Sequence, residues 1–325
     1  MLNRIIRTGT VVMAMAAALL FQPAAATAGD KPLVIAAGPE LGVYFPVAAA
    51  LRLTVIDAKT MAADRLAITA SAGSVANIDG LRKGRYDLAI VQEDIAEDAF
   101  RGAGPFAAAG GWDGLRSVMR FHKEALVLVA RRDAKITRIA DLKGKRVAAG
   151  PEGSGSRPAV DRILASLGAG DTVKRIETGI DNGIRALCRG EVDAAFLVIG
   201  QPSALLIDVL ARCKSRLVPI DGPVATAISQ SMPAFQPMTI PGRLYPSQPK
   251  DVKTLGVDAV LVARADVDDD AVAAVVAAIR GDLWLFRNLH PVLSPITDED
   301  LRPDSGGLPL HSGAARAFRQ AVTVF

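Results

Sequence analysis

The stretch Arg146-Val147-Ala148-Ala149-Gly150-Pro151-Glu152-Gly153-Ser154-Gly155-Ser156-Arg157 joins a short apolar run to a glycine- and serine-rich loop and a helix start. The helix is predicted to continue to about Leu167. A strand that leads through such a loop into a helix is the repeating unit of α/β proteins. The same order occurs earlier, at residues 33–56 and 66–84. The sequence therefore predicts an α/β fold.

Short uncharged runs and helical spacings extend this pattern along the chain. The predicted strands are 33–36, 66–70, 87–91, 125–130, 146–149, 173–176, 194–199 and 258–263. The predicted helices are about 44–56, 75–84, 157–167, 184–188, 205–213 and 267–289. Continuous apolar strands separated by helices favour a parallel sheet that is covered on both faces.

The strand and helix units form two runs, joined near residues 120–124. The proline-rich stretch 233–250 is interpreted as a second connection. Two connections predict two lobes with a cleft between them: residues 29–122 plus 256–325 form lobe 1, and residues 123–255 form lobe 2.

The N-terminus has the pattern of a secretory signal. Arg4 and Arg7 precede an apolar run from Val11 to Phe21, and Ala26-Thr27-Ala28 fits a cleavage site. The run is too short for a membrane span, which needs roughly 20 residues. Residues 1–28 are therefore predicted to be a cleaved signal peptide and the mature protein to be periplasmic. A buried helix or an uncleaved anchor is the alternative.

Composition excludes several classes of protein. The 325 residues carry a net charge of +4 and only 5% aromatic residues, with no Lys/Arg block. A surface that stacks on bases needs more aromatic residues, and one that follows a phosphate backbone needs clustered Lys and Arg, so no nucleic-acid partner is expected. Hydrophobic residues make up 50% of the chain, which is globular composition.

The two cysteines, Cys188 and Cys213, each end a predicted helical segment, and a strand lies between the two segments. Export permits disulfides, and the geometry of two successive helices makes a bridge feasible. A Cys188–Cys213 disulfide is predicted, with two buried free thiols as the alternative.

Three loops at predicted strand ends, residues 38–42, 71–74 and 150–156, are rich in glycine or serine. In a parallel sheet such loops lead into helix N-termini, whose free N–H groups favour an anion. Arg157 adds a planar fork that can hold a carboxylate. The alternative is that the serines only cap their helices.

Motifs for catalysis or metal binding are absent from the sequence. The loop at 150–157 has no phosphate-loop lysine, and the three histidines have no metal-ligand spacing. His122 is interpreted as a solvated residue, and the pairs Glu93-Asp94 and Glu97-Asp98 as a solvated helix face. The chain is therefore predicted to be no enzyme and to need no cofactor or metal.

Four stretches at these loops and strands resemble the TAXI-type solute-binding subunits of TRAP transporters, which have the type II periplasmic-binding-protein fold. The stretches are Gly42-Val43-Tyr44-Phe45-Pro46, Thr69 to Asn77, Leu81 to Gln92 with Asp94, and Ala140 to Val147 with Gly153 to Arg157. Pro39-Glu40-Leu41 departs from the pattern, because the family usually has small residues there.

The resemblance implies two lobes, each a mostly parallel sheet flanked by helices, with a ligand cleft between them. It implies a monomer that captures a small carboxylate, such as glutamate or 2-oxoglutarate, and delivers it to a TRAP-type membrane permease. A periplasmic sensing module for a membrane receptor, or an enzyme on the same fold, is the alternative. Resemblance and loop position together give the candidate ligand-binding residues Tyr44, Ser71, Ser74, Gln92, Ser154, Ser156, Arg157 and Gln201.

Overall fold

The computed structural model describes residues 31–320 apart from 167, 169, 171, 246 and 304–306. The predicted signal peptide, the predicted helix end at Leu167 and the proline at 246 lie outside the described residues. The strands are β1 (Leu33–Ala36), β2 (Leu66–Thr69), β3 (Leu88–Gln92), β4 (Leu115–Arg131), β5 (Arg146–Ala148), β6 (Lys174–Ile176), β7 (Ala194–Gly200), β8 (Ser215–Val218), β9 (Gln236–Ile240) and β10 (Val252–Arg264).

Helices connect most of these strands. They are α1 (Tyr44–Asp57), α2 (Ser74–Arg82), α3 (Glu93–Arg101), α4 (Ser156–Ser166), α5 (Ile180–Arg189), α6 (Ala204–Arg212), α7 (Gly222–Ser231), α8 (Asp269–Gly281), α9 (Leu283–Asn288) and α10 (Ser312–Arg319). No helix among the described residues is both long enough and apolar enough to cross a membrane.

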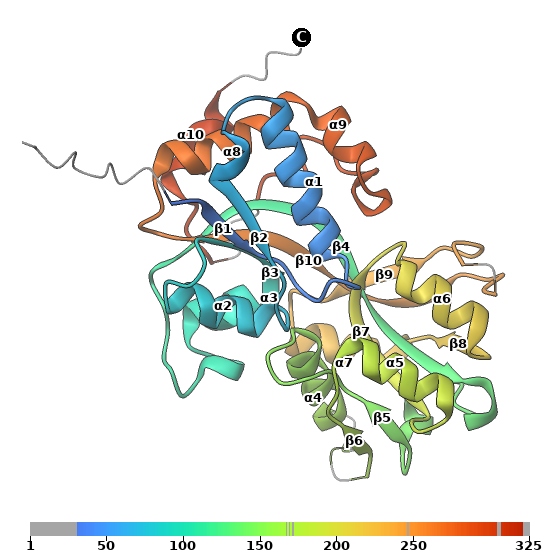
Figure 1. Ribbon diagram of the computed structural model, residues 1–325. Helices are drawn as coiled ribbons and strands as arrows, with labels where there is room; N and C mark the ends of the chain where they lie inside the picture. Colours follow the sequence, from blue (N-terminus) through green and yellow to red (C-terminus); the bar gives the residue numbers. More distant parts are fainter. Residues whose placement is uncertain are drawn as a thin grey trace, which may run out of the picture. The chain divides into compact units, whose positions relative to one another are not determined.

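The sheet has two parallel blocks joined by two long antiparallel strands. Its order is β2-β1-β3-β10-β4-β7-β5-β6, with β8 beside β4 and β9 beside β10. Strand β1 pairs in parallel with β2 and β3, and β5 pairs in parallel with β6 and β7. Strands β4 and β10 pair with each other and border both blocks (Figure 1). This is the predicted α/β architecture of two lobes, each a mostly parallel sheet flanked by helices.

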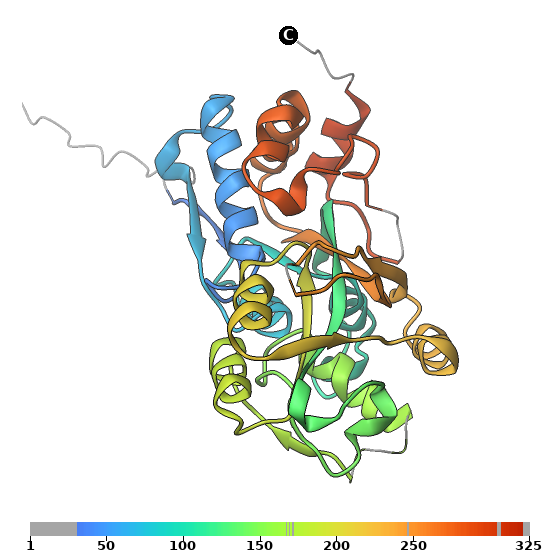
Figure 2. The same ribbon diagram turned by 90° about the vertical axis from the view of Figure 1, so that its right-hand side faces the viewer.

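Alternating side chains give the sheet two buried faces. In β3, Leu88 and Ile90 pack with α1 and α8, whereas Ala89 and Val91 pack with α2 and α3. In lobe 2, β4 and β7 bury one face against α4 and α7 and the other against α5 and α6. Figures 1 and 2 show α1, α8, α9 and α10 gathered at one end of the structure. The parallel strands β1, β2, β3 and β7 carry no charged residue, as expected for a parallel sheet that is covered on both faces.

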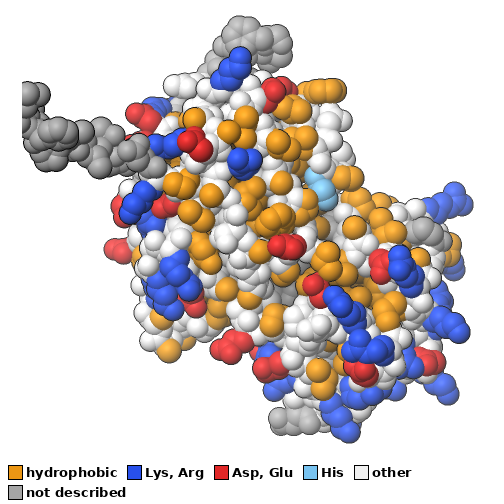
Figure 3. Space-filling model, viewed as in Figure 1, with side chains coloured by type: hydrophobic (Ala, Val, Ile, Leu, Met, Phe, Trp, Pro, Cys, Tyr) orange, Lys and Arg blue, Asp and Glu red, His pale blue; other side chains and the backbone are white. Residues whose placement is uncertain are grey.

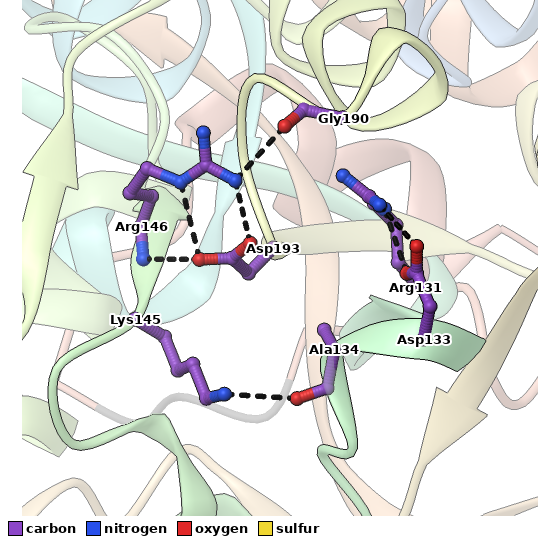
Figure 4. A network of polar contacts seen from close by, with 7 residues as sticks. All are labelled: Arg131, Asp133, Ala134, Lys145, Arg146, Gly190 and Asp193. Atoms are coloured by element: carbon purple, nitrogen blue, oxygen red, sulfur yellow. Dashed lines mark hydrogen bonds and ion pairs between the residues drawn. The ribbon is translucent and has the colours of Figure 1, made fainter.

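An aspartate directly precedes β3 in one block and β7 in the other, and each binds the backbone of the neighbouring strand. The backbone N–H of Val34 in β1 donates to Asp87 at 2.9 Å, and that of Arg146 in β5 donates to Asp193 at 2.9 Å. The Arg146 guanidinium also donates to both carboxylate oxygens of Asp193, at 3.2 and 2.7 Å, and to the carbonyl of Gly190 (Figure 4). These contacts fix the starts of the strands, so their carboxyl ends are held in place beside the loops.

Cys188 and Cys213 form a disulfide, as predicted, with their Cα atoms 4.7 Å apart. Cys188 lies in the last turn of α5, and Cys213 follows the end of α6 directly. The bridge joins the two helices that cover one face of lobe 2.

Two sequence interpretations of the C-terminal half need correction. Residues 233–250 are not a connection between lobes, because β9 lies in this stretch and pairs with β10 as a hairpin. The predicted helix over 267–289 is interrupted at Asp282, whose carboxylate caps α9 by accepting from Leu285. The chain from Pro32 onward forms one compact unit, so the lobe boundaries at residues 122/123 and 255/256 stay a prediction.

Candidate functional site

A cavity of about 420 Å³ lies where the loops of the two blocks meet. Its lining comes from the loops that follow β1, β2, β5 and β6, together with Gln92 at the end of β3, Glu124 of β4 and residues 195–199 of β7. Every one of these loops leaves the carboxyl end of a parallel strand, which is where open α/β sheets bind ligands. The walls are mainly apolar, with polar groups at a few points.

Four helices begin at the cavity. Tyr44, Ser74, Ser156 and Ile180 are the first residues of α1, α2, α4 and α5, and all four line it. The first N–H groups of a helix have no partner within the helix, and its dipole places positive potential at that end. Four converging helix N-termini therefore make the cavity favourable for an anion.

The alternative that the serines only cap their helices holds for Ser154, whose hydroxyl accepts from the backbone N–H of Arg157 at 3.2 Å, but not for Ser74 and Ser156. The Ser74 hydroxyl accepts from the backbone N–H of Gln92 at 3.1 Å, and the Ser156 hydroxyl accepts from that of Val198 at 3.0 Å. Each serine thus ties the start of a helix to the third strand of its block. The Ser156 hydroxyl keeps a proton to donate, whereas the Ser74 hydroxyl is hydrogen-bonded to Tyr44.

A buried acid lies at the inner wall of the cavity. Glu124 of β4 is 3% exposed, and its Oε2 accepts a hydrogen bond of 2.5 Å from the Tyr44 hydroxyl. Burial raises the pKa of Glu124 to about 8, and the charges of Asp94 and Asp258 act in the same direction. Burial, with the Glu124 charge and its hydrogen bond, also raises the pKa of Tyr44 well above its ordinary value. Sequence reasoning missed Glu124, which has no motif signal.

A second buried acid corrects the prediction of a solvated helix face at 93–98. Asp94 is 5% exposed, and burial raises its pKa to about 7. The Gln92 amide donates to Asp94 Oδ1 at 3.2 Å, whereas Oδ2 is buried with no partner among the described residues. His122 is also buried, not solvated, and burial lowers its pKa to about 3. These side chains are buried because β3, β4 and β10 lie side by side at this point.

The two blocks contact each other beside the cavity. The backbone N–H of Ala76 donates to the carbonyl of Gly153 at 3.0 Å, and Arg162 of α4 pairs with Asp98 of α3. Gly155 lies so close to lobe 1 that a Cβ there would meet the Gln92 side-chain oxygen. The loop at 150–156 therefore needs glycine in order to approach Gln92.

The structure brings five of the eight predicted site residues together and places three elsewhere. Those that line the cavity are Tyr44, Ser74, Gln92, Ser154 and Ser156. Ser71 bonds the carbonyl of Ala37 and the N–H of Gly73, which is a turn contact. Gln201 bonds the carbonyl of Ile199 and the hydroxyl of Tyr245. Neither Ser71 nor Gln201 is part of the lining.

Arg157 points to a neighbouring cavity, not to the one described above. Its guanidinium bonds Asp161 at 2.9 Å and Glu177 at 2.7 Å, so its charge is already balanced by two carboxylates. Arg185 of α5 is the single cation among the described residues that line the cavity, and it is exposed. Figure 3 shows that many Lys and Arg side chains cover lobe 2 on the face in view. Sequence reasoning missed Arg185, which has no motif around it.

Of the three residues that depart from the TAXI-type pattern, Pro39 alone reaches the cavity. Pro39 lines the cavity, whereas Glu40 and Leu41 are exposed. Among the described residues, no group of three or more His, Cys, Asp or Glu side chains is placed to hold a metal ion.

Comparisons with known proteins agree with this architecture. The model of the NMT1-like family matches residues 35–321. A solved structure of a protein from Bordetella bronchiseptica RB50 is 15% identical, with a TM-score of 0.52, and the match covers 90% of this chain and 89% of that one. A structure described with glutathione import via GshT and the cystine ABC importer TcyBC of Streptococcus mutans is 12% identical, with a TM-score of 0.53. That match covers 83% of this chain and 99% of the other. At such identities the likeness concerns the fold.

Proposed function

This chain belongs to the NMT1-like family, and we propose that it is a periplasmic solute-binding protein that captures a small carboxylate. The observation that carries the proposal is the cavity at which α1, α2, α4 and α5 all begin. Peptide dipoles there favour one negative group, and the apolar walls accommodate a short carbon chain. Glutamate, 2-oxoglutarate or a related acid has this chemistry.

The proposed ligand contacts come from both lobes. Tyr44, Ser74 and Gln92 would contact the ligand from lobe 1, and Ser156 from lobe 2. Arg185 at the exposed side of the cavity supplies a charge for a second acid group. The polar atoms of four candidates already bond other groups, so these residues are not proposed as contacts: Ser71, Ser154, Arg157 and Gln201.

Capture would proceed by closure of the two lobes. A ligand that contacts both lobes stabilises the closed arrangement by its differential affinity for it. The contacts between residues 71–76 and 150–156 support this proposal, because they form only when the lobes are close. Delivery to a TRAP-type membrane permease is proposed from the four stretches that resemble TAXI-type subunits, and a signal peptide over residues 1–28 would direct the export.

A panel of thermal melts tests the proposal. The protein is unfolded and refolded to remove carried-over ligand, then melted with acids and with matched neutral amides, such as L-glutamate with L-glutamine and succinate with succinamide. A ligand at about 100 times its dissociation constant stabilises the native state by about 2.7 kcal/mol, which raises the melting midpoint by several degrees. The proposal expects a rise with an acid and none with its amide. The proposal would be contradicted if only neutral solutes raised the melting midpoint, or if none of the solutes raised it.

A further inference from the structure

Glu124 occupies a special place in the sheet, on a strand shared by both lobes. Its backbone lies opposite Gly200 of β7 on one side and Val257 of β10 on the other. Its side chain is buried and yet lines the cavity, so it contacts whatever enters. A carboxyl at such a position needs either a cation or a proton, because burying an unpaired charge is costly.

No cation is paired with Glu124 in the described part of the chain. Tyr44 of α1 donates to its Oε2, and Oε1 has no hydrogen-bond partner among the described residues. The groups that act on its pKa are Tyr44 of α1, Asp94 of α3 and Asp258 of β10. Its own strand, β4, also carries Arg120, His122 and Lys123, and both cations pair with Asp258. Arg185 of α5 lines the same cavity.

These neighbours leave the carboxyl without a compensating charge. Lys123 bonds Asp258 at 2.9 Å, so its charge is neutralised there. His122 is uncharged at neutral pH because its buried ring has a pKa of about 3. Asp94 and Asp258 disfavour a further negative charge nearby. Arg185 is exposed to solvent and is not among the groups that shift the pKa of Glu124.

We propose that Glu124 carries a proton and donates it from Oε1 to an oxygen of the acid ligand, so that the inner end of the ligand is recognised by a carboxylic acid instead of an arginine. Because the Tyr44 hydrogen occupies Oε2, the proton is left to Oε1. Glu124 is then a specificity-determining residue. Its O–H donates to a ligand that presents an anionic or carbonyl oxygen at this place, and it disfavours a ligand that presents an ammonium or amide N–H there. This inference rests on the proposed function and names how that site selects its ligand.

The proposal makes binding depend on pH in one direction. The pKa of Glu124, about 8, means that the acid keeps its proton at neutral pH. Above that value the free protein loses the proton, whereas the complex with an anion must retain it. Affinity therefore falls roughly tenfold for each pH unit above the pKa, and binding takes up a proton from solution. Below the pKa this group contributes no pH dependence.

Calorimetry tests the proposed hydrogen bond from Glu124 to the ligand. The first probe is 2-oxoglutarate, followed by the acid that stabilises the protein most in the thermal panel. Titrations at pH 6.5, 8.0 and 9.5, each in two buffers of different ionisation enthalpy, measure affinity and proton uptake. The wild-type protein is expected to lose at least tenfold in affinity between pH 6.5 and 9.5. Glu124→Gln keeps the shape and an N–H donor, so its affinity should stay nearly constant over the same range. Asp94→Asn is the matched control, because it removes the other buried acid and should retain the pH dependence.

A ligand-free measurement separates this inference from the proposed function. With glutamate labelled at the side-chain carboxyl carbon, the NMR signal that Glu124→Gln removes belongs to Glu124. It should titrate near pH 8 in the free protein. Titration below pH 6, or equal pH dependence in the wild type and Glu124→Gln, would overturn the inference while leaving the solute-binding proposal intact. If no acid stabilises the protein, the proposed function fails, and the donation from Glu124 to a ligand fails with it.

Discussion

Ser74 and Ser156 hold matching places in the two lobes, and around them the lobes differ. Each serine begins a helix and accepts a hydrogen bond from the backbone of the third strand in its block. Two buried acids lie near one side of the cavity: Asp94 belongs to lobe 1, and Glu124 lies on β4, the strand that the two lobes share. On the lobe 2 side, the cavity has the exposed cation Arg185. The two lobes thus share a scaffold, but a ligand would meet the acid Glu124 at the shared strand β4 and the positive charge of Arg185 on lobe 2.

A second match lies at the start of the third strands. Gly84-x-x-Asp87 and Gly190-x-x-Asp193 each end a helix with a left-handed glycine and place an aspartate on the backbone of the first strand. Here too the lobes differ, because the disulfide reinforces lobe 2 only. Substitutions at matched positions can therefore measure how independent the two lobes are.

Removing the disulfide should have the largest effect on stability. Cys188→Ser with Cys213→Ser frees a loop of 25 residues, and the chain-entropy model assigns this loop about 3.5 kcal/mol. Urea unfolding of the double variant, compared with reduced and oxidised wild type, checks this. If the double variant unfolds at the same urea concentration as the oxidised wild type, the bridge has no stabilising role.

Replacing the strand-start aspartates should have an intermediate effect. Asp193→Asn weakens charge-assisted hydrogen bonds to Arg146, and we expect a loss of about 2 kcal/mol in the free energy of unfolding at pH 7. Asp87→Asn is the lobe 1 counterpart, with Arg264 as its partner. The same urea experiment measures both. Equal losses of unfolding free energy would indicate that the lobes unfold together. A separate transition in one variant would indicate that they unfold independently.

The Asp193 effect should depend on pH. Its hydrogen bonds to Arg146 hold the pKa of Asp193 below its ordinary value. The native state therefore favours the ionised form, and the stabilisation is present above the unfolded pKa of about 3.9 and is lost as the pH falls through the folded value. The difference between wild type and Asp193→Asn should shrink from pH 7 to pH 3. A difference that stays constant would show that the ion pair does not contribute.

The serine pair should show the smallest effect on stability. Ser74→Ala and Ser156→Ala each leave a backbone N–H without its partner, at a cost of about 1 kcal/mol in unfolding free energy. Because both hydroxyls also line the cavity, affinity for the ligand should fall in both variants. Thermal melts with and without the acid separate the two effects. Loss of stability without loss of affinity in one variant would place the ligand on the other lobe.

The sequence predicted the scaffold well because its signals are local. Apolar runs, glycine turns and helix spacings fixed all of the predicted strands to within a few residues, apart from β4 and β10, which extend further than their apolar runs. Strands β8 and β9 were missed because β8 is short and carries Ser215 and Arg216, while β9 is polar and contains Pro237.

The candidate site was predicted only where a loop marked it. Tyr44, Ser74, Gln92, Ser154 and Ser156 lie on or beside strand-end loops, which sequence reasoning can locate. Glu124 was missed because its burial depends on strands β7 and β10, far away in the sequence. The position of Arg157 was misjudged although Asp161, one helical turn later, offers it a partner.

The pairing of β3 with β10 also sets an order for folding. Leu88 to Gln92 pair with Ala259 to Ala263, which lie about 170 residues later, so lobe 1 must close a long loop before its sheet is complete. Strands β5 to β8, by contrast, pair with one another or with the C-terminal half of β4 within one continuous segment, although the other edge of β4 pairs with β10. Contacts close in sequence form sooner than distant ones. Lobe 2 can therefore fold while the chain is still being made, whereas lobe 1 must wait for its last strand and meanwhile leaves the edge of β3 open to aggregation or to a chaperone.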